Sequence, residues 1–150
     1  MKIAIGCDHG GYALKLAVKG HLEDKGYEVV DYGCDGPESV DYPIYGERVG
    51  RAVAGGECAL GVLICGTGIG ISLAANRVHG IRAAVCSESY SAELTRRHND
   101  ANMIAFGARI VGPQLAEAIV DAFIETEPEG GRHAERVKLI MKLEQEQTTH

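Results

Sequence analysis

The sequence predicts one α/β domain over residues 1–150, a three-layer α/β/α Rossmann-like fold with a five-stranded parallel sheet and an extra C-terminal helix. Short apolar runs alternate five times with longer segments of helical period, which is typical of a parallel sheet covered by helices. The run Leu60–Cys65 is apolar throughout, as expected of a strand buried on both faces. A length of 150 residues fits one domain, and neither a repeat nor a linker interrupts it.

The first half of the chain predicts three strands and two helices. Apolar residues at helical spacing extend from Leu14 to Leu22, and Gly26 is placed to end that helix. A second helical face, from Tyr45 to Val53, ends at Gly55-Gly56. The strands are expected at 3–5, 28–30 and 60–65, with a polar loop over 33–43.

The second half predicts two further strands among four helices. A helix is expected to begin near Gly70, and Pro113 stands where a first helical turn tolerates proline. A break at 128–131 precedes the last helix, which is expected to continue through Leu143 into a frayed polar tail over 144–150. The remaining elements are strands at 83–86 and 103–106 and a helix at 89–98.

Composition and charge exclude several classes of protein. Fifteen Lys and Arg against 21 Asp and Glu give a net charge of -6, which argues against a nucleic-acid partner. No apolar run approaches the roughly 20 residues that cross a bilayer, and Asp8 and His9 come too early for a signal peptide. Five cysteines do not form a disulfide framework. We expect a soluble, reduced, cytoplasmic protein without a membrane partner.

Polar residues follow four of the five expected strands. Parallel α/β sheets bind ligands at the carboxyl ends of their strands, near a topological switch point. These four positions therefore predict a ligand site at one edge of the sheet. They are Cys7-Asp8-His9, Cys65-Gly66-Thr67-Gly68, Ser87-Glu88 and Arg109.

The segment 64–70, Ile-Cys-Gly-Thr-Gly-Ile-Gly, is a glycine loop that can direct backbone N–H groups at an anion. It lacks the Gly-Lys-Ser/Thr of a Walker A loop and the arginine of a cysteine phosphatase loop. Ile71 stands where a dinucleotide fingerprint has its last glycine, although Glu88 lies 20 residues after Gly68, near where a ribose-binding acid is expected.

Cys65 is a candidate reactive thiol. A cysteine in a strand is usually a buried structural residue. Its place at a strand end, before a glycine loop and an expected helix N-terminus, favours the reactive thiolate instead. Three other cysteines lack this setting and are interpreted as structural: Cys34, Cys58 and Cys86.

Two polar segments lie farther along the chain. His98-Asn99 can be a helix end with a favourably placed histidine, or a proton donor beside an amide that binds a sugar hydroxyl. Arg132 and Arg136, one turn apart at an expected helix start, can be a solvated face or a phosphate clamp that Arg109 could join. The sequence holds no Cys-x-x-Cys pair, no His-Glu-x-x-His motif and no carboxylate ladder, so we expect chemistry without a metal or cofactor.

These motifs together resemble the type B ribose-5-phosphate isomerases, a family that also includes galactose-6-phosphate isomerase subunits. The family has a cysteine-base branch and a branch with a glutamate later in the same loop. Cys65 is present here and Ile71 fills the glutamate position, so the chain resembles the cysteine branch. The resemblance runs nearly end to end, through residues 6–11, 41–43, 64–72, 74–76, 80–83, 98–100, 130–133 and 136.

The resemblance implies a role for each matching residue in interconverting ribose 5-phosphate and ribulose 5-phosphate through a cis-enediol, in the pentose phosphate pathway. Cys65 would be the base, and His98, with Thr67, would open the sugar ring. The loop residues Gly66, Thr67, Gly68, Ile69 and Gly70 would hold the enediolate oxygen. Further substrate contacts would come from Asp8, His9, Asn99, Arg109, Arg132 and Arg136, with Asp41 and Tyr42 lining the pocket.

The resemblance also implies a homodimer or homotetramer in which each site is built from two chains, and a sheet order that departs from chain order at the last strands. Two alternatives stay open. The chain could be a galactose-6-phosphate or allose-6-phosphate isomerase, or a non-catalytic module that binds a nucleotide or phosphate on the same loop.

Overall fold

Five parallel strands form one sheet in the computed structural model, which describes residues 1–148. The strand order is β2-β1-β3-β5-β4, so β5 lies between β3 and β4. The predicted five-stranded parallel sheet is confirmed, as is the departure from chain order at its last strands. The strands are β1 (Lys2–Cys7), β2 (Glu28–Asp31), β3 (Leu60–Cys65), β4 (Ala83–Val85) and β5 (Met103–Gly107).

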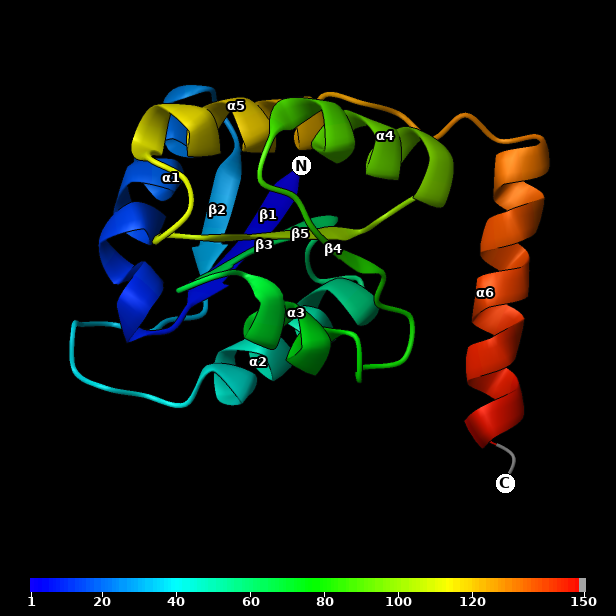
Figure 1. Cartoon of the computed structure of the whole chain (residues 1–150), viewed down its shortest axis with the longest axis horizontal. Helices are drawn as coiled ribbons and strands as arrows, with labels where there is room; N and C mark the ends of the chain where they lie inside the picture. The colour runs from blue at the N-terminus through cyan, green and yellow to red at the C-terminus, as the bar shows by residue number, and fades with distance from the viewer. Residues whose placement is uncertain (149–150) are drawn as a thin grey trace.

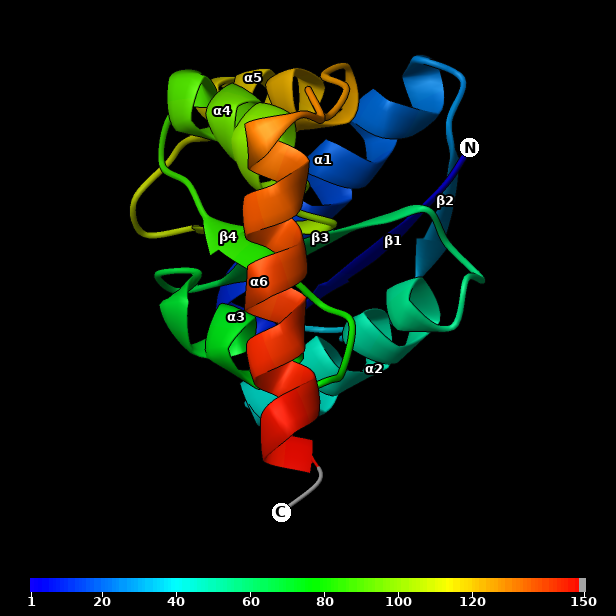
Figure 2. The same cartoon turned by 90° about the vertical axis from the view of Figure 1, so that its right-hand side faces the viewer.

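Helices cover both faces of the sheet, which confirms the predicted three layers (Figure 1). One face carries α1, α4 and α5, and the other carries α2 and α3 (Figures 1 and 2). The helices are α1 (Tyr12–Asp24), α2 (Tyr42–Ala54), α3 (Ile69–Ala75), α4 (Ser89–Asn99), α5 (Pro113–Ile124) and α6 (Arg132–Thr148), with a short 3-10 turn, η1 (His9–Gly11), before α1.

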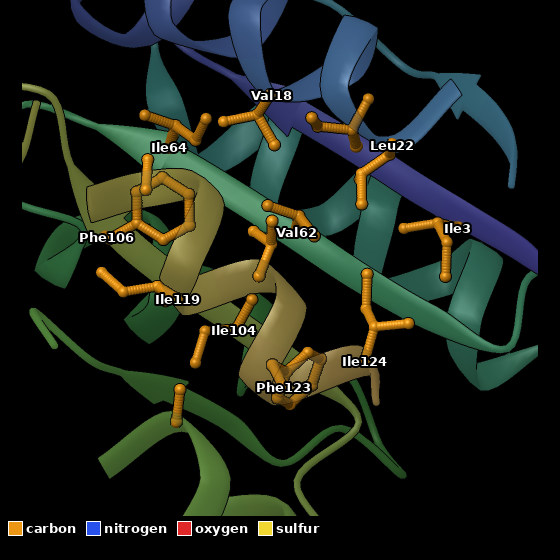
Figure 3. Packing of buried hydrophobic residues seen from close by; sticks show 14 of the residues in the cluster. Ile3, Val18, Leu22, Val62, Ile64, Ile104, Phe106, Ile119, Phe123 and Ile124 are labelled. Atoms are coloured by element: carbon orange, nitrogen blue, oxygen red, sulfur yellow. The ribbon is translucent and has the colours of Figure 1, made fainter. Parts of the chain in front are cut away.

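The strand β3 is buried along its whole length, as its apolar run predicts. Val62 and Ile64 belong to the apolar cluster beneath α1 and α5 (Figure 3). Leu63 and Cys65 belong to the cluster beneath α2 and α3. Alternate residues therefore anchor β3 to both helical layers, which fixes the position of the glycine loop that follows it. The first cluster joins Val18 and Leu22 of α1 to Ile104, Phe106, Ile119 and Phe123.

The last helix, α6, stands beside the β4 edge of the sheet rather than on either face (Figure 2). The backbone N–H of Gly80 donates to Glu144 Oε2 at 3.1 Å, and Arg82 Nη1 contacts Met141 Sδ at 3.3 Å. Among the described residues, no helix is both long enough and apolar enough to cross a membrane.

The helix α6 continues to Thr148, so the prediction that it gives way to a frayed tail at residue 144 was wrong for 144–148. The contact between Glu144 and Gly80 holds this turn, and Lys142 lies 3.9 Å from Glu146 one turn further on. Tertiary contact and an i,i+4 ion pair extend a helix whose polar composition favoured fraying. The last two residues, 149–150, lie outside the described part of the chain.

Candidate active site

The topological switch point lies between β1 and β3, because the chain places β2 on one side of β1 and β3 on the other. Cys7 pairs with Ile64 at the carboxyl ends of these strands, and the Asp8 N–H donates to the Ile64 carbonyl at 3.2 Å. The segment after β5 joins them, since the Arg109 N–H donates to the Gly66 carbonyl at 3.0 Å. Three of the four predicted strand-end segments therefore meet, as expected for such a fold.

Cys65 closes β3 and is 5% exposed. Its Sγ accepts a hydrogen bond of 3.1 Å from the Gly68 N–H, because the chain turns back at Gly68 with φ of 83°. A Cβ at Gly68 would lie 2.7 Å from the Phe106 backbone, so both the conformation and the space require glycine. The loop thus aims a backbone donor at the sulfur, a contact that is stronger for a thiolate than for a thiol.

The loop 66–70 packs backbone to backbone against the end of β5. A Cβ at Gly107 would overlap the Thr67 Cα and lie 2.5 Å from the Gly66 carbonyl oxygen. Thr67 Oγ1 accepts from the Ile69 N–H at 3.2 Å, and the Thr67 side chain is exposed. Sequence reasoning assigned Gly107 no part in the site, because only the tertiary contact reveals it.

Asp8 and His9 lie beside the glycine loop and are held by backbone donors. The buried Asp8 accepts from the Gly11 N–H through Oδ1 at 3.2 Å and so caps η1, an element that the sequence did not predict. His9 Nδ1 accepts from the Val40 N–H at 3.1 Å. A Cβ at Gly66 would lie 3.6 Å from Arg109 Nε, which places the Arg109 side chain at the same loop.

The start of α2 borders the far end of the loop. A Cβ at Gly70 would lie 2.7 Å from Tyr42 Cζ, so the Tyr42 ring rests against this glycine. Asp41 is the exposed N-cap residue of α2 and its side chain makes no capping hydrogen bond. Both residues therefore lie at the edge of this group, which we call the carboxyl-end group: Asp8, His9, Tyr42, Cys65–Gly70 and Arg109.

The second set of predicted residues lies at the opposite end of the sheet. Cys65 pairs with Gly107, whereas His98 and Asn99 end α4 just before β5 begins at Met103. Four residue steps at about 3.3 Å separate Met103 from Gly107, or about 13 Å of strand. The structure therefore does not bring His98, Asn99, Arg132 and Arg136 to Cys65 within one chain.

His98 has two neighbours that sequence reasoning left without a role. His98 Nε2 lies 3.1 Å from Glu129 Oε2, and His133 Nε2 lies 3.7 Å from the same oxygen. The two imidazole rings stack with centroids 4.2 Å apart and planes 10° apart. Because residues 98 and 129–133 are distant in sequence, no local signal indicated this cluster. We call it the amino-end group, together with Asn99, Arg132 and Arg136.

Charge decides what the amino-end group can bind. Among the described residues, His98, Glu129 and His133 form a cluster whose donor atoms all lie within 4.8 Å of one another, as a metal site requires. Desolvation and then the charges of His98, Arg132 and Arg136 nevertheless lower the pKa of His133. Glu129 acts in the opposite direction and raises the pKa of His133. The exposed Arg132 and Arg136 offer an anionic ligand two guanidinium groups at this place. The expected lack of a metal or cofactor stays a prediction.

Glu88 has a structural role that removes the support for a dinucleotide site. Its carboxylate accepts the Ser91 N–H at 2.9 Å and caps α4. Hydrogen bonds from Ser91 hold the pKa of Glu88 below its ordinary value. The spacing of 20 residues from Gly68 is thus explained by a helix cap.

Three cysteines outside the glycine loop have raised thiol pKa values. Burial raises the pKa of Cys7 to about 12 and of Cys86 to about 11, and it also raises that of Cys58. Cys7 Sγ lies 3.8 Å from Cys34 Sγ in the core. These environments keep Cys7, Cys58 and Cys86 protonated and unreactive.

Known proteins match almost the whole chain. A family model described as Ribose/Galactose Isomerase matches residues 3–140. Ribose-5-phosphate isomerase B of Escherichia coli (strain K12) is 56% identical over 144 residues, which cover 96% of this chain and 97% of that protein. A D-erythrulose-4-phosphate isomerase of Pectobacterium atrosepticum is 43% identical over 141 residues, 93% of each chain.

A solved structure of ribose-5-phosphate isomerase B from Clostridium thermocellum superimposes with a TM-score of 0.96. It is 56% identical in sequence, and the match covers 97% of this chain and 99% of that one. Sequence and fold agree over the same residues that carry the glycine loop and both end groups. The chain therefore belongs to the ribose/galactose isomerase family.

Proposed function

We propose that this protein is an aldose–ketose isomerase that interconverts D-ribose 5-phosphate and D-ribulose 5-phosphate in the non-oxidative pentose phosphate pathway. The observation that carries the proposal is Cys65, whose sulfur receives a backbone N–H from a glycine loop at the switch point of the sheet. Ile71, buried in the core, offers no alternative base. The names of the E. coli and C. thermocellum relatives support the same reaction.

In this proposal Cys65 is the base of an enediol mechanism. Its thiolate takes the proton from carbon 2 of the open-chain aldose, and the bonding pair moves to form a cis-enediolate with negative charge on oxygen 1. The proton of the hydroxyl on carbon 2 then moves to oxygen 1, and the same sulfur returns its proton to carbon 1 as the ketone forms at carbon 2. Backbone N–H groups of the loop Gly66–Gly70 bind the enediolate oxygen, while the Gly68 N–H holds the sulfur at 3.1 Å.

The complete site requires two chains, because the two end groups lie about 13 Å of strand apart in one chain. One chain supplies Cys65 with Thr67, Asp8, His9 and Arg109. A partner copy supplies His98 to open the furanose ring, Asn99 for a sugar hydroxyl, and Arg132 and Arg136 for the phosphate. Leu139, Ile140 and Leu143 on α6 are large exposed apolar residues, which supports a homodimer or a homotetramer.

Two further proposals follow from the chemistry. Proton transfer between adjacent carbons requires no change of oxidation state overall, so the isomerase needs no redox cofactor. Cys65 as the base and the loop N–H groups as enediolate donors supply the remaining chemistry without a metal. A net charge of -6 and five free cysteines fit a cytoplasmic enzyme that binds small phosphorylated sugars and neither nucleic acid nor membrane.

The test is ribulose 5-phosphate formation from ribose 5-phosphate in excess chelator, with the wild type, Cys65→Ala and the control Cys86→Ala. A general base contributes roughly 10²–10⁴-fold, so Cys65→Ala should lose at least that much turnover. Cys86→Ala removes a buried thiol away from the loop and should retain turnover. Full activity of Cys65→Ala, or loss of wild-type activity with chelator, would contradict the mechanism.

Substrate preference separates this proposal from its alternatives. Relatives in this family carry names with different sugar phosphates, including D-erythrulose 4-phosphate. Galactose 6-phosphate and allose 6-phosphate should be tested in the same assay. A higher kcat/KM for either hexose phosphate would replace ribose 5-phosphate as the assigned substrate. Binding of ribose 5-phosphate without turnover would identify a non-catalytic module.

A further inference from the structure

The ring of His98 is held from two sides by residues that no assigned role explains. Glu129 Oε2 lies 3.1 Å from His98 Nε2, and the His133 ring stacks on the imidazole at 4.2 Å. The Glu129 N–H also donates to the Arg97 carbonyl at 2.9 Å, which ties the 128–131 segment to α4 beside His98. The His133 N–H donates to the Gly130 carbonyl at 3.2 Å at the start of α6.

Stability does not explain this arrangement. The side chains of His98 and Glu129 are 37% and 48% exposed, and ion pairs at such positions contribute about 0–1 kcal/mol. The contacts instead remove the freedom of the imidazole to rotate. With Nε2 turned to a carboxylate and one face covered by His133, Nδ1 is the ring nitrogen that these two contacts leave for a ligand.

We propose that Glu129 and His133 are positioning residues that orient the imidazolium of His98 so that Nδ1 protonates the ring oxygen of ribose 5-phosphate. This inference rests on the proposed function, in which His98 is the proton donor for ring opening. The C1–O4 bond breaks and its electron pair stays on O4, which takes the proton from Nδ1. The hydroxyl on C1 releases its proton to solvent as C1=O1 forms, and His98 regains a proton from solvent.

The chemistry of the two substrates isolates this step. Ribulose 5-phosphate carries its ketone on carbon 2 and phosphate on carbon 5, so it cannot close a five-membered ring and binds as an open chain. Exchange of its C1 proton with deuterated water therefore needs Cys65 but not ring opening. Ribose 5-phosphate is mostly a furanose, so its turnover needs both steps.

The experiment compares these two rates in Glu129→Ala and His133→Ala, each purified as the full chain. Ribose 5-phosphate turnover should fall by about tenfold or more, towards the roughly 10²-fold that marks loss of a general acid. Exchange at C1 of ribulose 5-phosphate should stay at the wild-type rate. His133→Phe, which keeps an aromatic ring for the stack, should recover most of the turnover that His133→Ala loses.

The matched control is Glu127→Ala, which removes the same charge from an exposed position two residues earlier on the same segment. It should leave both rates unchanged. Equal losses of turnover and exchange in Glu129→Ala would reveal structural damage and overturn the proposal, and so would full turnover in both alanine variants. Retained exchange in Cys65→Ala would instead overturn the proposed function.

Discussion

The two groups of candidate site residues, at opposite ends of the sheet, differ in what holds them in place. The carboxyl-end group is built around closely packed backbone: Gly68, and Gly107 packed against the loop, allow contacts that any Cβ would block, and Cys65 is buried. The amino-end group is made of long side chains on α4 and α6, with Glu129 about half exposed and both arginines exposed. One end is fixed by close packing and the other by a few ion pairs and a ring stack.

This structural difference matches the two different tasks that the proposed mechanism gives to the two groups. A base that must reach carbon 1 and carbon 2 in turn benefits from a rigid, dehydrated backbone frame. Groups that recognise phosphate and protonate a ring oxygen need charge and reach, which exposed side chains supply. In the function proposed above each end is incomplete by itself, so the proposed active site depends on a partner copy that brings the opposite end.

The largest effect we predict is recovery of activity from two inactive proteins. Cys65→Ala removes the proposed base of one end group, and His98→Gln removes the proposed acid of the other. Each variant should lose roughly 10²–10⁴-fold in turnover. When the two variants are co-expressed from differently tagged genes, half of the dimers should contain one chain of each variant. Each of these mixed dimers keeps one intact site of two. The preparation should therefore show about a quarter of wild-type turnover, measured as ribulose 5-phosphate formed per chain.

The control is Cys65→Ala co-expressed with Cys65→Ala under both tags, which should remain inactive. A mixture no more active than its components would mean that one chain contains its whole site. It would contradict both the two-chain assembly and the separation of the end groups.

The next effect probes the backbone frame. A Cβ at Gly107 would overlap Thr67 and crowd the Gly66 carbonyl, whereas one at Gly112 meets nothing within 4 Å. Gly107→Ala should lower kcat by about 10²-fold, because a displacement near 1 Å costs that much. It should also lower the free energy of unfolding by about 1–3 kcal/mol. Gly112→Ala should leave kcat unchanged, and a similar loss there would refute the packing explanation.

The sequence predicted the carboxyl end better than the amino end, for a physical reason. Strand ends, a glycine loop and a terminal cysteine are local signals, so Asp8, Cys65 and Arg109 could be placed at one edge from periodicity alone. The contact of His98 with Glu129 and His133 joins segments more than 30 residues apart and needs the tertiary fold. The end of α6 was mispredicted for the same reason, because Gly80 holds Glu144 from a distant loop.

A smaller effect probes the exposed side-chain clamp. Arg132→Ala and Arg136→Ala should each raise KM for ribose 5-phosphate by about 10–100-fold, since a hydrogen bond to a charged group contributes roughly 1.5–3 kcal/mol. The value of kcat should change little, because phosphate is bound equally in ground and transition states. The control is Arg51→Ala, which removes an exposed arginine paired with Glu47. An unchanged KM in both variants would reject the phosphate assignment.

The smallest effect that we predict at neutral pH concerns stability, and it involves the ion pair between Lys15 and Asp31 beneath the carboxyl-end group. Lys15 is 1% exposed and bonds Asp31 at 2.9 Å and the Cys34 carbonyl at 2.6 Å. Cys34 in turn pairs with Cys7, next to Asp8. Burial raises the pKa of Asp31, but hydrogen bonds from Lys15 and Gly33 outweigh it and hold the pKa below its usual 3.8.

A carboxyl group whose pKa is lower in the folded state stabilises the protein above its unfolded pKa, and this contribution is lost as pH falls through the folded value. Asp31→Asn should therefore be less stable than the wild type at pH 7 yet lose less stability between pH 5 and pH 2, measured by urea unfolding at one protein concentration. Asp35→Asn, at an exposed position nearby, is the control and should follow the wild type. If Asp31→Asn kept the wild-type acid slope, the carboxyl-end frame would not depend on this buried ion pair, and close packing around the glycines alone would hold it.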